Sequence, residues 1–130
     1  MLLGVSGGIA AYKACETVRR LTEHGLLVQV LMTEAATQFV SPLTFATLSG
    51  QPVWTDEFPS SIGTPASSQD VVAHIDIVEQ ADVFLVAPAT ANTIAKIAHG
   101  IADNLLTSAA VAWRGPALIA PAMNYRMYEN

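Results

Sequence analysis

Short, continuously apolar runs that recur along the chain are the feature that most limits its fold. The runs that predict strands are Leu2–Val5, Leu26–Met32, Asp82–Ala87 and Ala117–Ala120. A sheet with one solvated face would alternate apolar and polar residues, and these runs do not alternate. They indicate a parallel sheet that helices cover on both faces.

The stretches between these runs have helical spacing. From Ile9 to about Glu23 the apolar residues follow one helix face, and His24 and Gly25 end the helix. The other predicted helical segments are Glu34–Val40, Pro42–Leu48, one that begins at His74, Ala91–His99 closed by Gly100, and one capped by Asp103 or Asn104. Ser60–Ser68 reads as a mobile surface loop. The chain, 1–130, is therefore expected to form a single α/β domain with a Rossmann-like, flavodoxin-like, doubly wound parallel sheet.

Composition narrows the possible partners. Hydrophobic residues make up 52% of the chain and charged residues 13%, which predicts surface buried between subunits as well as a core. A net charge of -5 argues against nucleic acid as a partner, and no apolar run is long enough to span a bilayer. The single cysteine, Cys15, and the absence of a leader pattern at the N-terminus favour the cytoplasm.

In doubly wound folds, ligands bind where the strands end at their carboxyl side. The first such loop is Ser6-Gly7-Gly8, followed by Ile9, and its bare N–H groups at a helix start form an anion site. The second predicted strand ends at Thr33, where a dinucleotide fold would place an acid. The two loops together favour a mononucleotide phosphate over NAD, although such turns also occur without a ligand.

Two later loops add polar groups at the same edge. One of these loops consists of six small or polar residues, Pro88, Ala89, Thr90, Ala91, Asn92 and Thr93. Thr90 or Asn92 could be a helix cap, but three polar side chains exceed that need, and small residues would let a flat ring lie against the backbone. The other loop carries Asn124, which is either a turn residue or a substrate contact.

One histidine lacks a ready structural explanation. His24 and His99 each precede a glycine at a predicted helix end, where a cation interacts favourably with the helix dipole. His74 lies at a predicted helix start, which favours a neutral imidazole that can act as a base. No cluster of residues has metal-ligand spacing, so no metal is expected.

Four ordered segments resemble the homo-oligomeric flavin-containing cysteine decarboxylases. They are Gly4–Lys13, His74–Asp76, Pro88–Thr93 and Pro121–Met127, and Gly100–Thr107 matches as well. The resemblance is strongest to the N-terminal decarboxylase half of a bifunctional bacterial enzyme that also has phosphopantothenate–cysteine ligase activity. It implies decarboxylation of 4′-phosphopantothenoylcysteine to phosphopantetheine in coenzyme A biosynthesis, with FMN as cofactor.

The resemblance also implies residue roles. Ser6–Ile9 and Thr33 would bind the FMN phosphate, and Pro88–Thr93 would line the flavin. His74 and Asn124 would be catalytic, with Asn124 and Met127 in the substrate-binding motif. The family further implies a homo-oligomer, a trimer or a dodecamer.

The resemblance leaves alternatives and shows departures. Peptidyl-cysteine decarboxylation, a related transferase and a non-catalytic FMN-binding regulatory subunit remain open, the transferase being disfavoured by the Pro-Ala-Met-Asn motif. Gly8 stands where many relatives have serine, and Tyr128 where the motif often has tryptophan. The family's substrate flap carries a cysteine that these 130 residues lack, so we expect the chain to be truncated before that flap.

Overall fold

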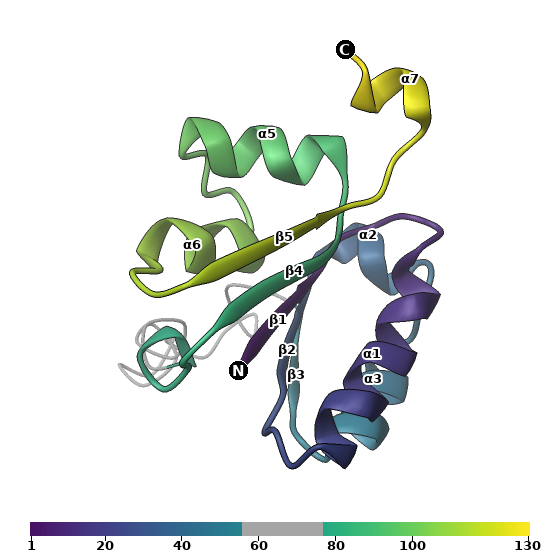
Figure 1. Ribbon diagram of the computed structural model, residues 1–130, viewed down its shortest axis with the longest axis vertical. Coiled ribbons are helices and arrows are strands. Elements are labelled where there is room, and N and C mark those ends of the chain that lie inside the picture. The colour runs from purple at the N-terminus through teal and green to yellow at the C-terminus, as the bar shows by residue number, and fades with distance from the viewer. Residues whose placement is uncertain (56–76) are drawn as a thin grey trace, which may run out of the picture.

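A five-stranded parallel sheet forms the centre of the computed structural model, which describes residues 1–55 and 77–130 (Figure 1). The strand order is β3-β2-β1-β4-β5. The strands are β1 (Leu2–Val5), β2 (Gln29–Met32), β3 (Val53–Trp54), β4 (Phe84–Ala89) and β5 (Ala117–Pro121). The order reverses between β1 and β4, which is the point where ligands bind in folds of this type.

The predicted fold class is confirmed, and the bounds of three predicted strands are corrected, the last of which ends at Pro121 instead of Ala120. The second strand begins at Gln29, because Leu26 and Leu27 are solvent-exposed and follow the turn at Gly25. The strand predicted at Asp82–Ala87 instead runs from Phe84 through Ala89. β3 was missed, because two residues, Val53 and Trp54, carry no periodicity that a sequence pattern could show.

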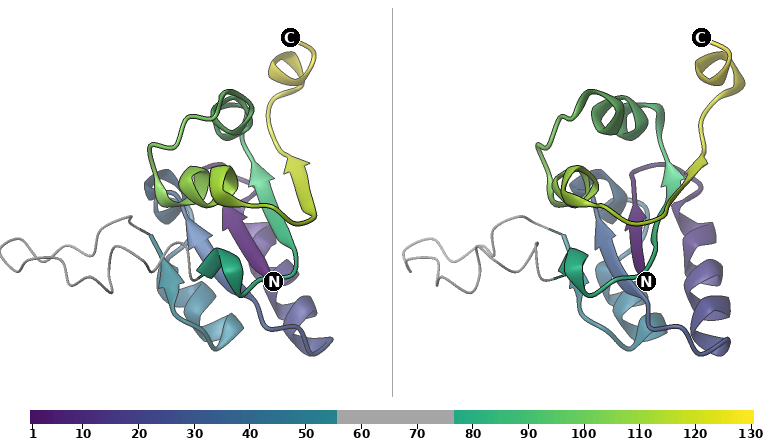
Figure 2. Two further views of the ribbon diagram at one scale, coloured as in Figure 1. Left: turned by 90° about the vertical axis from the view of Figure 1, so that its left-hand side faces the viewer. Right: turned by 60° about the vertical axis from the view of Figure 1, so that its left-hand side comes forward.

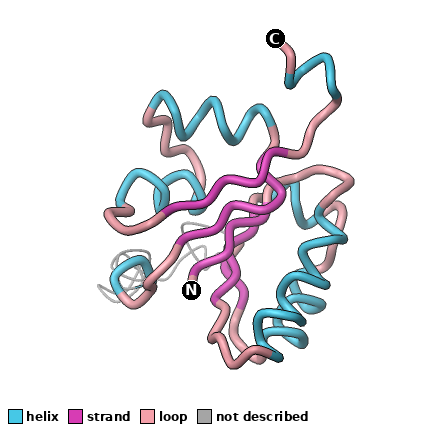
Figure 3. Tube along the Cα trace, viewed as in Figure 1, coloured by secondary structure: helices cyan, strands magenta, loops and turns pink. Residues whose placement is uncertain are grey.

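Helices cover both faces of the sheet, as Figures 2 and 3 show. On one face lie α1 (Ala11–Glu23), α2 (Glu34–Thr37) and α3 (Pro42–Ser49); on the other lie α5 (Ala91–His99) and α6 (Leu105–Ala112). The last element, α7 (Tyr125–Tyr128), stands beyond the end of β5. The region 34–40 is a shorter helix than expected, ending at Thr37.

Alternate strand residues build two separate core layers. Leu3 and Val5 point to the layer under α1 and α3, where they pack with Phe45. Leu2 points to the opposite layer, where it packs with Phe84 and Leu106. Both faces of β1 are thus buried, which explains why the strand is apolar at every position.

The outer strand β5 differs from the expectation of burial on both faces. All five of its residues are exposed, Leu118 at 59% and Ile119 at 42%. β5 pairs with β4 alone, so it forms an edge of the sheet. The predicted loop Ser60–Ser68 and His74 lie outside the described residues, and the described part of the helix predicted from His74 covers 77–79.

Candidate functional site

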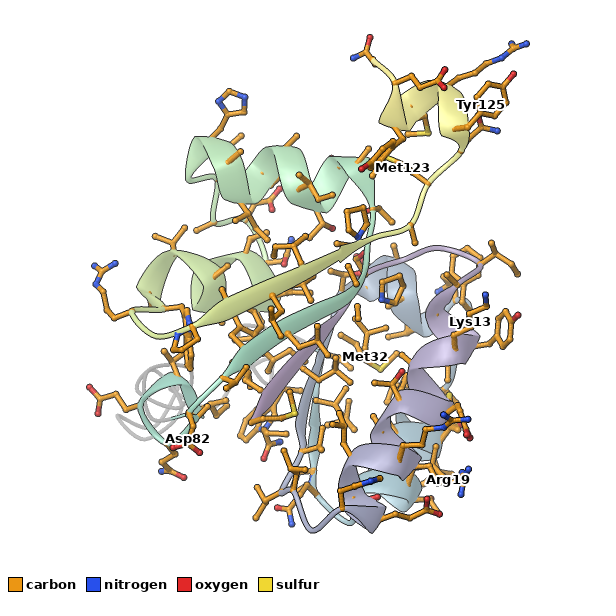
Figure 4. The ribbon with its side chains drawn as sticks, in the orientation of Figure 1. Lys13, Arg19, Met32, Asp82, Met123 and Tyr125 are labelled. Atoms are coloured by element: carbon orange, nitrogen blue, oxygen red, sulfur yellow. The ribbon has the colours of Figure 1, made fainter. Side chains whose placement is uncertain are left out.

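A cleft of about 1030 Å³ lies at the carboxyl ends of the strands, at the point where the strand order reverses. The loops after β1, β2, β4 and β5 all contribute to it. Its lining consists of Gly7, Gly8, Ile9, Ala10, Thr33, Glu34, Ala35, Thr90, Ala91, Asn92, Thr93, Lys96, Asp103, Asn104, Ala122, Met123, Asn124 and Met127. Figure 4 shows Met123 and Tyr125 at this end of the molecule and Asp82 at the other.

Gly7 is required by the close approach of two loops. A Cβ atom at this position would lie 2.4 Å from the Cβ of Ala35 and 2.7 Å from its carbonyl carbon. Gly8 has room by comparison, because a Cβ there would lie 3.4 Å from the nearest heavy atom, Thr90 Cγ2. The first glycine therefore joins the β1 and β2 loops, and the second leaves open space in the cleft.

The helix that follows this turn begins without a side-chain cap. Ala10 is the N-cap residue of α1 and makes no capping hydrogen bond through its side chain. The first N–H groups of a helix carry partial positive charge and need acceptors. Two of these groups are already bonded to the backbone, Ala11 N to Gly8 O at 2.9 Å and Lys13 N to Ala10 O at 3.0 Å. An anionic group can bind the start of α1 through the N–H groups that remain, where Gly8 and Ile9 line the cleft.

Ser6 is placed behind the cleft. Its hydroxyl donates to the carbonyl oxygen of Pro88 at 2.6 Å and accepts from the backbone N–H of Thr90 at 2.9 Å. Its own N–H donates to the same Pro88 oxygen at 3.2 Å. Ser6 is fully buried, so in this conformation it connects β1 to the end of β4 and does not reach the cleft.

The six-residue segment expected to be a loop is divided between a strand and a helix. Pro88 and Ala89 belong to β4, are buried and lie outside the cleft lining. Thr90 is the N-cap residue of α5 and accepts from Thr93 N at 3.3 Å, and its hydroxyl donates to Thr93 Oγ1 at 3.1 Å. The capping alternative thus holds for Thr90, while the segment from Thr90 to Thr93 still lines the cleft.

Thr33 and Asn124 also combine a capping role with a position in the cleft. Thr33 Oγ1 accepts from Ala36 N at 3.2 Å and caps α2. Asn124 Oδ1 accepts from Arg126 N at 3.0 Å and caps α7. The cap engages the carbonyl oxygen of Asn124, so its amide nitrogen is the donor that a ligand could use.

Four polar residues of the cleft, Glu34, Lys96, Asp103 and Asn104, were not predicted as site residues, and three of them are linked to one another. Lys96 of α5 forms an ion pair with Asp103, 2.6 Å between Nζ and Oδ2, and Asn104 donates to the other oxygen of Asp103 at 3.0 Å. The hydrogen bond from Lys96 lowers the pKa of the Asp103 carboxyl below its usual range. Sequence spacing could not find this group, because it depends on how α5 lies beside the turn into α6.

Two features that would add further chemistry are absent from the described ranges, 1–55 and 77–130. These ranges contain no group of His, Cys, Asp and Glu residues that could hold a metal ion. Within the same residues, no helix has the length and apolar character to cross a membrane. Cys15 is half-buried beside the core, and burial raises the pKa of its thiol, as expected of a packing residue.

The whole chain, residues 1–130, matches the family described as Flavoprotein. The chain belongs to the Flavoprotein family. It is similar to the coenzyme A biosynthesis bifunctional protein CoaBC of Bacillus subtilis, with 50% identity over 130 residues. That match covers 100% of this chain and 30% of the relative, so the chain spans under a third of that protein.

Three further likenesses of this Flavoprotein chain are to proteins named as decarboxylases. A probable phosphopantothenoylcysteine decarboxylase of Streptococcus mutans is 49% identical over 132 residues, covering 100% of the chain and 70% of the relative. The structure of a PPC decarboxylase mutant complexed with pantothenoylaminoethenethiol superposes with a TM-score of 0.80 and 36% identity, covering 99% of the chain and 69% of that structure. The FMN-dependent cysteine decarboxylase SpaF gives a TM-score of 0.83 and 31% identity, with 99% and 71% covered.

Proposed function

We propose that this Flavoprotein chain is the FMN-binding part of a phosphopantothenoylcysteine decarboxylase that acts in coenzyme A biosynthesis. The main support is the cleft at the point where the strand order reverses. Its lining includes the uncapped start of α1, which suits a phosphate, and several small residues, which suit a flat ring. The relatives named CoaBC and phosphopantothenoylcysteine decarboxylase support it. Such a role would place the protein in the cytoplasm.

The residues present fit FMN. The open side of Gly8 and the start of α1 suit a phosphate, and Thr33 adds a hydroxyl beside them. Ala91, Asn92 and Thr93 offer small and polar surface for a flat ring. We assign Ser6, Pro88 and Ala89 to the support of this surface, since they fix the turns from behind.

When bound, FMN would supply the redox capacity that makes the cysteine moiety lose CO₂. The protein's own residues would bind and orient the reactants. The Asn124 amide nitrogen would donate to the substrate carboxylate, and Met127 would provide apolar contact beside it. His74, in the part of the chain outside the described ranges, is proposed as the base.

The cofactor is tested with matched flavins. We expect the purified protein to be yellow, to release FMN on heating, and to bind riboflavin, which lacks the phosphate, far more weakly. A colourless protein that takes up no FMN on titration would contradict the proposal. Equal binding of riboflavin and FMN would show that the protein does not bind the phosphate group of FMN.

Catalysis is tested by release of CO₂ from phosphopantothenoylcysteine, with the protein as it occurs in the cell. Turnover supports the decarboxylase. FMN binding without turnover on this substrate, but with turnover on a peptide with a C-terminal cysteine, would favour a peptidyl-cysteine decarboxylase. FMN binding without any turnover would favour a non-catalytic flavin-binding subunit.

We also propose that the protein assembles as a homo-oligomer, a trimer or a dodecamer. Large apolar side chains are exposed around the cleft and on β5, including Ile9 at 77%, Tyr125 at 62% and Tyr128 at 69%. Monomeric proteins rarely leave so much apolar surface in contact with water. Light scattering should give a mass that is a multiple of three chains, and a stable monomer would contradict this.

A further inference from the structure

Lys96 and Asp103 face each other across the turn that joins α5 to α6. Their side chains are 24% and 50% exposed, and the charged atoms lie 2.6 Å apart. The turn itself is closed by Gly100 in the left-handed conformation and by a hydrogen bond from Ile101 N to Lys96 O at 2.9 Å. Both charged residues line the cleft, so the pair forms part of its wall.

The pair is connected to a third cleft residue, Asn104. Asp103 accepts from Asn104 Nδ2 through Oδ1, at 3.0 Å, while its other oxygen accepts from Lys96. Asn104 Oδ1 accepts from Thr107 N at 3.1 Å, and Asn104 N donates to Thr107 Oγ1 at 3.3 Å. Thr107 is fully buried, so the Asn104 amide is held between the core and the ion pair.

The direction of these hydrogen bonds fixes which atom of Asn104 is available. A carboxylate only accepts, so Asp103 must receive the Nδ2 end of the amide. The start of α6 only donates, so it must receive the Oδ1 end. One hydrogen of Nδ2 is used by Asp103, and the second can be donated to a ligand in the cleft.

We propose that Lys96 and Asp103 are positioning residues that hold the Asn104 amide and this turn as a fixed wall of the cleft, which binds the ring or ribityl part of a flavin. The inference rests on the proposed function, because it takes FMN as the ligand. Its physical basis is the cleft, the continuous chain of hydrogen bonds from Lys96 to Thr107, and the fixed polarity of the amide. Lys96 acts through Asp103, to which its Nζ donates.

The competing explanation is an ordinary surface ion pair, which contributes little to stability and has no effect on a ligand. The chain offers a matched control for it. Glu16 on α1 is hydrogen-bonded to Arg19 and Arg20, with side-chain exposures of 46%, 48% and 70%. Figure 4 places Arg19 toward the far end of α1 from Met123, so this group lies away from the cleft.

The test is a double-mutant cycle with Lys96→Met, Asp103→Asn and the combined variant, and with Glu16→Gln as control. FMN affinity is measured by fluorescence, and the visible circular dichroism of bound flavin reports its orientation. We expect each single variant to bind FMN about threefold to tenfold more weakly and the double variant to be no worse than the weaker single. The control should match the wild type, and Lys96→Arg should retain most of the affinity.

Each other outcome counts against the positioning role. Wild-type affinity in the single variants, or losses that simply add in the double variant, would overturn it. A lower melting temperature with unchanged flavin affinity would reduce the pair to a structural contact. If the wild type binds no FMN, the proposed function fails first. In that case the NMR signals of the Asn104 side-chain amide are compared between the ligand-free wild type and the Asp103→Asn variant. Unchanged signals would show that Asp103 does not position this amide.

Discussion

On the side of the cleft formed by β1 and β2, Gly7 lies against Ala35 with no space for a methyl group, and Ser6 is buried with its hydrogen bonds used. On the side formed by β5 and α7, every strand residue is exposed and Asn124 is held by a local cap. The first side is set by the packing of the core. The second is held by backbone pairing of β5 with β4 and by the local cap of α7, which leaves its side chains free to serve a ligand or a neighbouring chain.

Replacement of Gly7 by alanine should have the largest effect. The new Cβ would meet Ala35, including its backbone, well inside contact distance, so one of the two loops must move. We expect the unfolding free energy to fall by about 1–3 kcal/mol, which is typical of overpacking, and flavin binding to be lost. Chemical denaturation measures the first and flavin titration the second.

Gly8→Ala is the matched control in the same turn. Its Cβ would make an ordinary contact with Thr90 Cγ2 at 3.4 Å, and Gly8 has no positive φ. Stability should change by less than about 0.5 kcal/mol. Equal losses in the two variants would show that the β1 loop is not fixed against β2 as described.

Ser6→Ala should come next. The change removes a buried hydroxyl and leaves Thr90 N without its acceptor. An unsatisfied buried group costs about 1–3 kcal/mol. Thr47→Ala, which removes an exposed hydroxyl bonded only within its own helix, should be close to neutral. A Ser6 variant as stable as the Thr47 variant would contradict the assignment of Ser6 as the link between β1 and β4.

Asn124→Asp tests the side of the cleft formed by β5 and α7, where we expect an effect on the rate and none on stability. Aspartate caps a helix as well as asparagine does, so the melting temperature should not move. The variant loses the amide donor and places a carboxylate near that of the substrate, which like charges oppose. CO₂ release by the natural full chain should fall about tenfold to a hundredfold, or roughly 1.4–2.8 kcal/mol. A fall in stability without a fall in rate would show that Asn124 has a structural role and does not bind the substrate.

Gly8→Ser should have the smallest effect on stability and a measurable one on binding. The position has room for the side chain, and a hydroxyl there would add a donor beside the start of α1. We expect FMN to bind about twofold to tenfold more tightly, since a hydrogen bond to a charged group contributes at most about 1.5–3 kcal/mol. Weaker binding would mean that FMN itself occupies the space beside Gly8.

Local signals in the sequence predicted much of this architecture. The apolar runs at β1 and β5, the end of α5 at Gly100, and a helix cap at Asp103 or Asn104 were all readable, because each depends on neighbours along the chain. The structure assigns the cap to Asn104. They also led to the loops that form most of the cleft lining.

What the sequence could not show depends on contacts between distant residues. Ser6 looked like a ligand donor, but its partner is Pro88, 82 positions away. Pro88 and Ala89 looked like loop residues, but pairing of Ala89 with Pro121 extends the strand through them. Lys96 and Asp103 meet because of a turn whose path no periodicity describes.

The uncapped start of α1 makes the stability of the fold depend on a bound ligand. At the other helix starts along the cleft, α2, α5, α6 and α7, a threonine or asparagine of the chain itself accepts from the backbone. At α1 the chain supplies no such group, and a bound phosphate would take its place as the missing cap. The ligand would then be a structural part of the first helix, and its loss would lower stability by RT ln(1 + c/Kd), which grows with the free cofactor concentration c. Cofactor supply in the cell would thereby set how much of this protein survives as a folded chain.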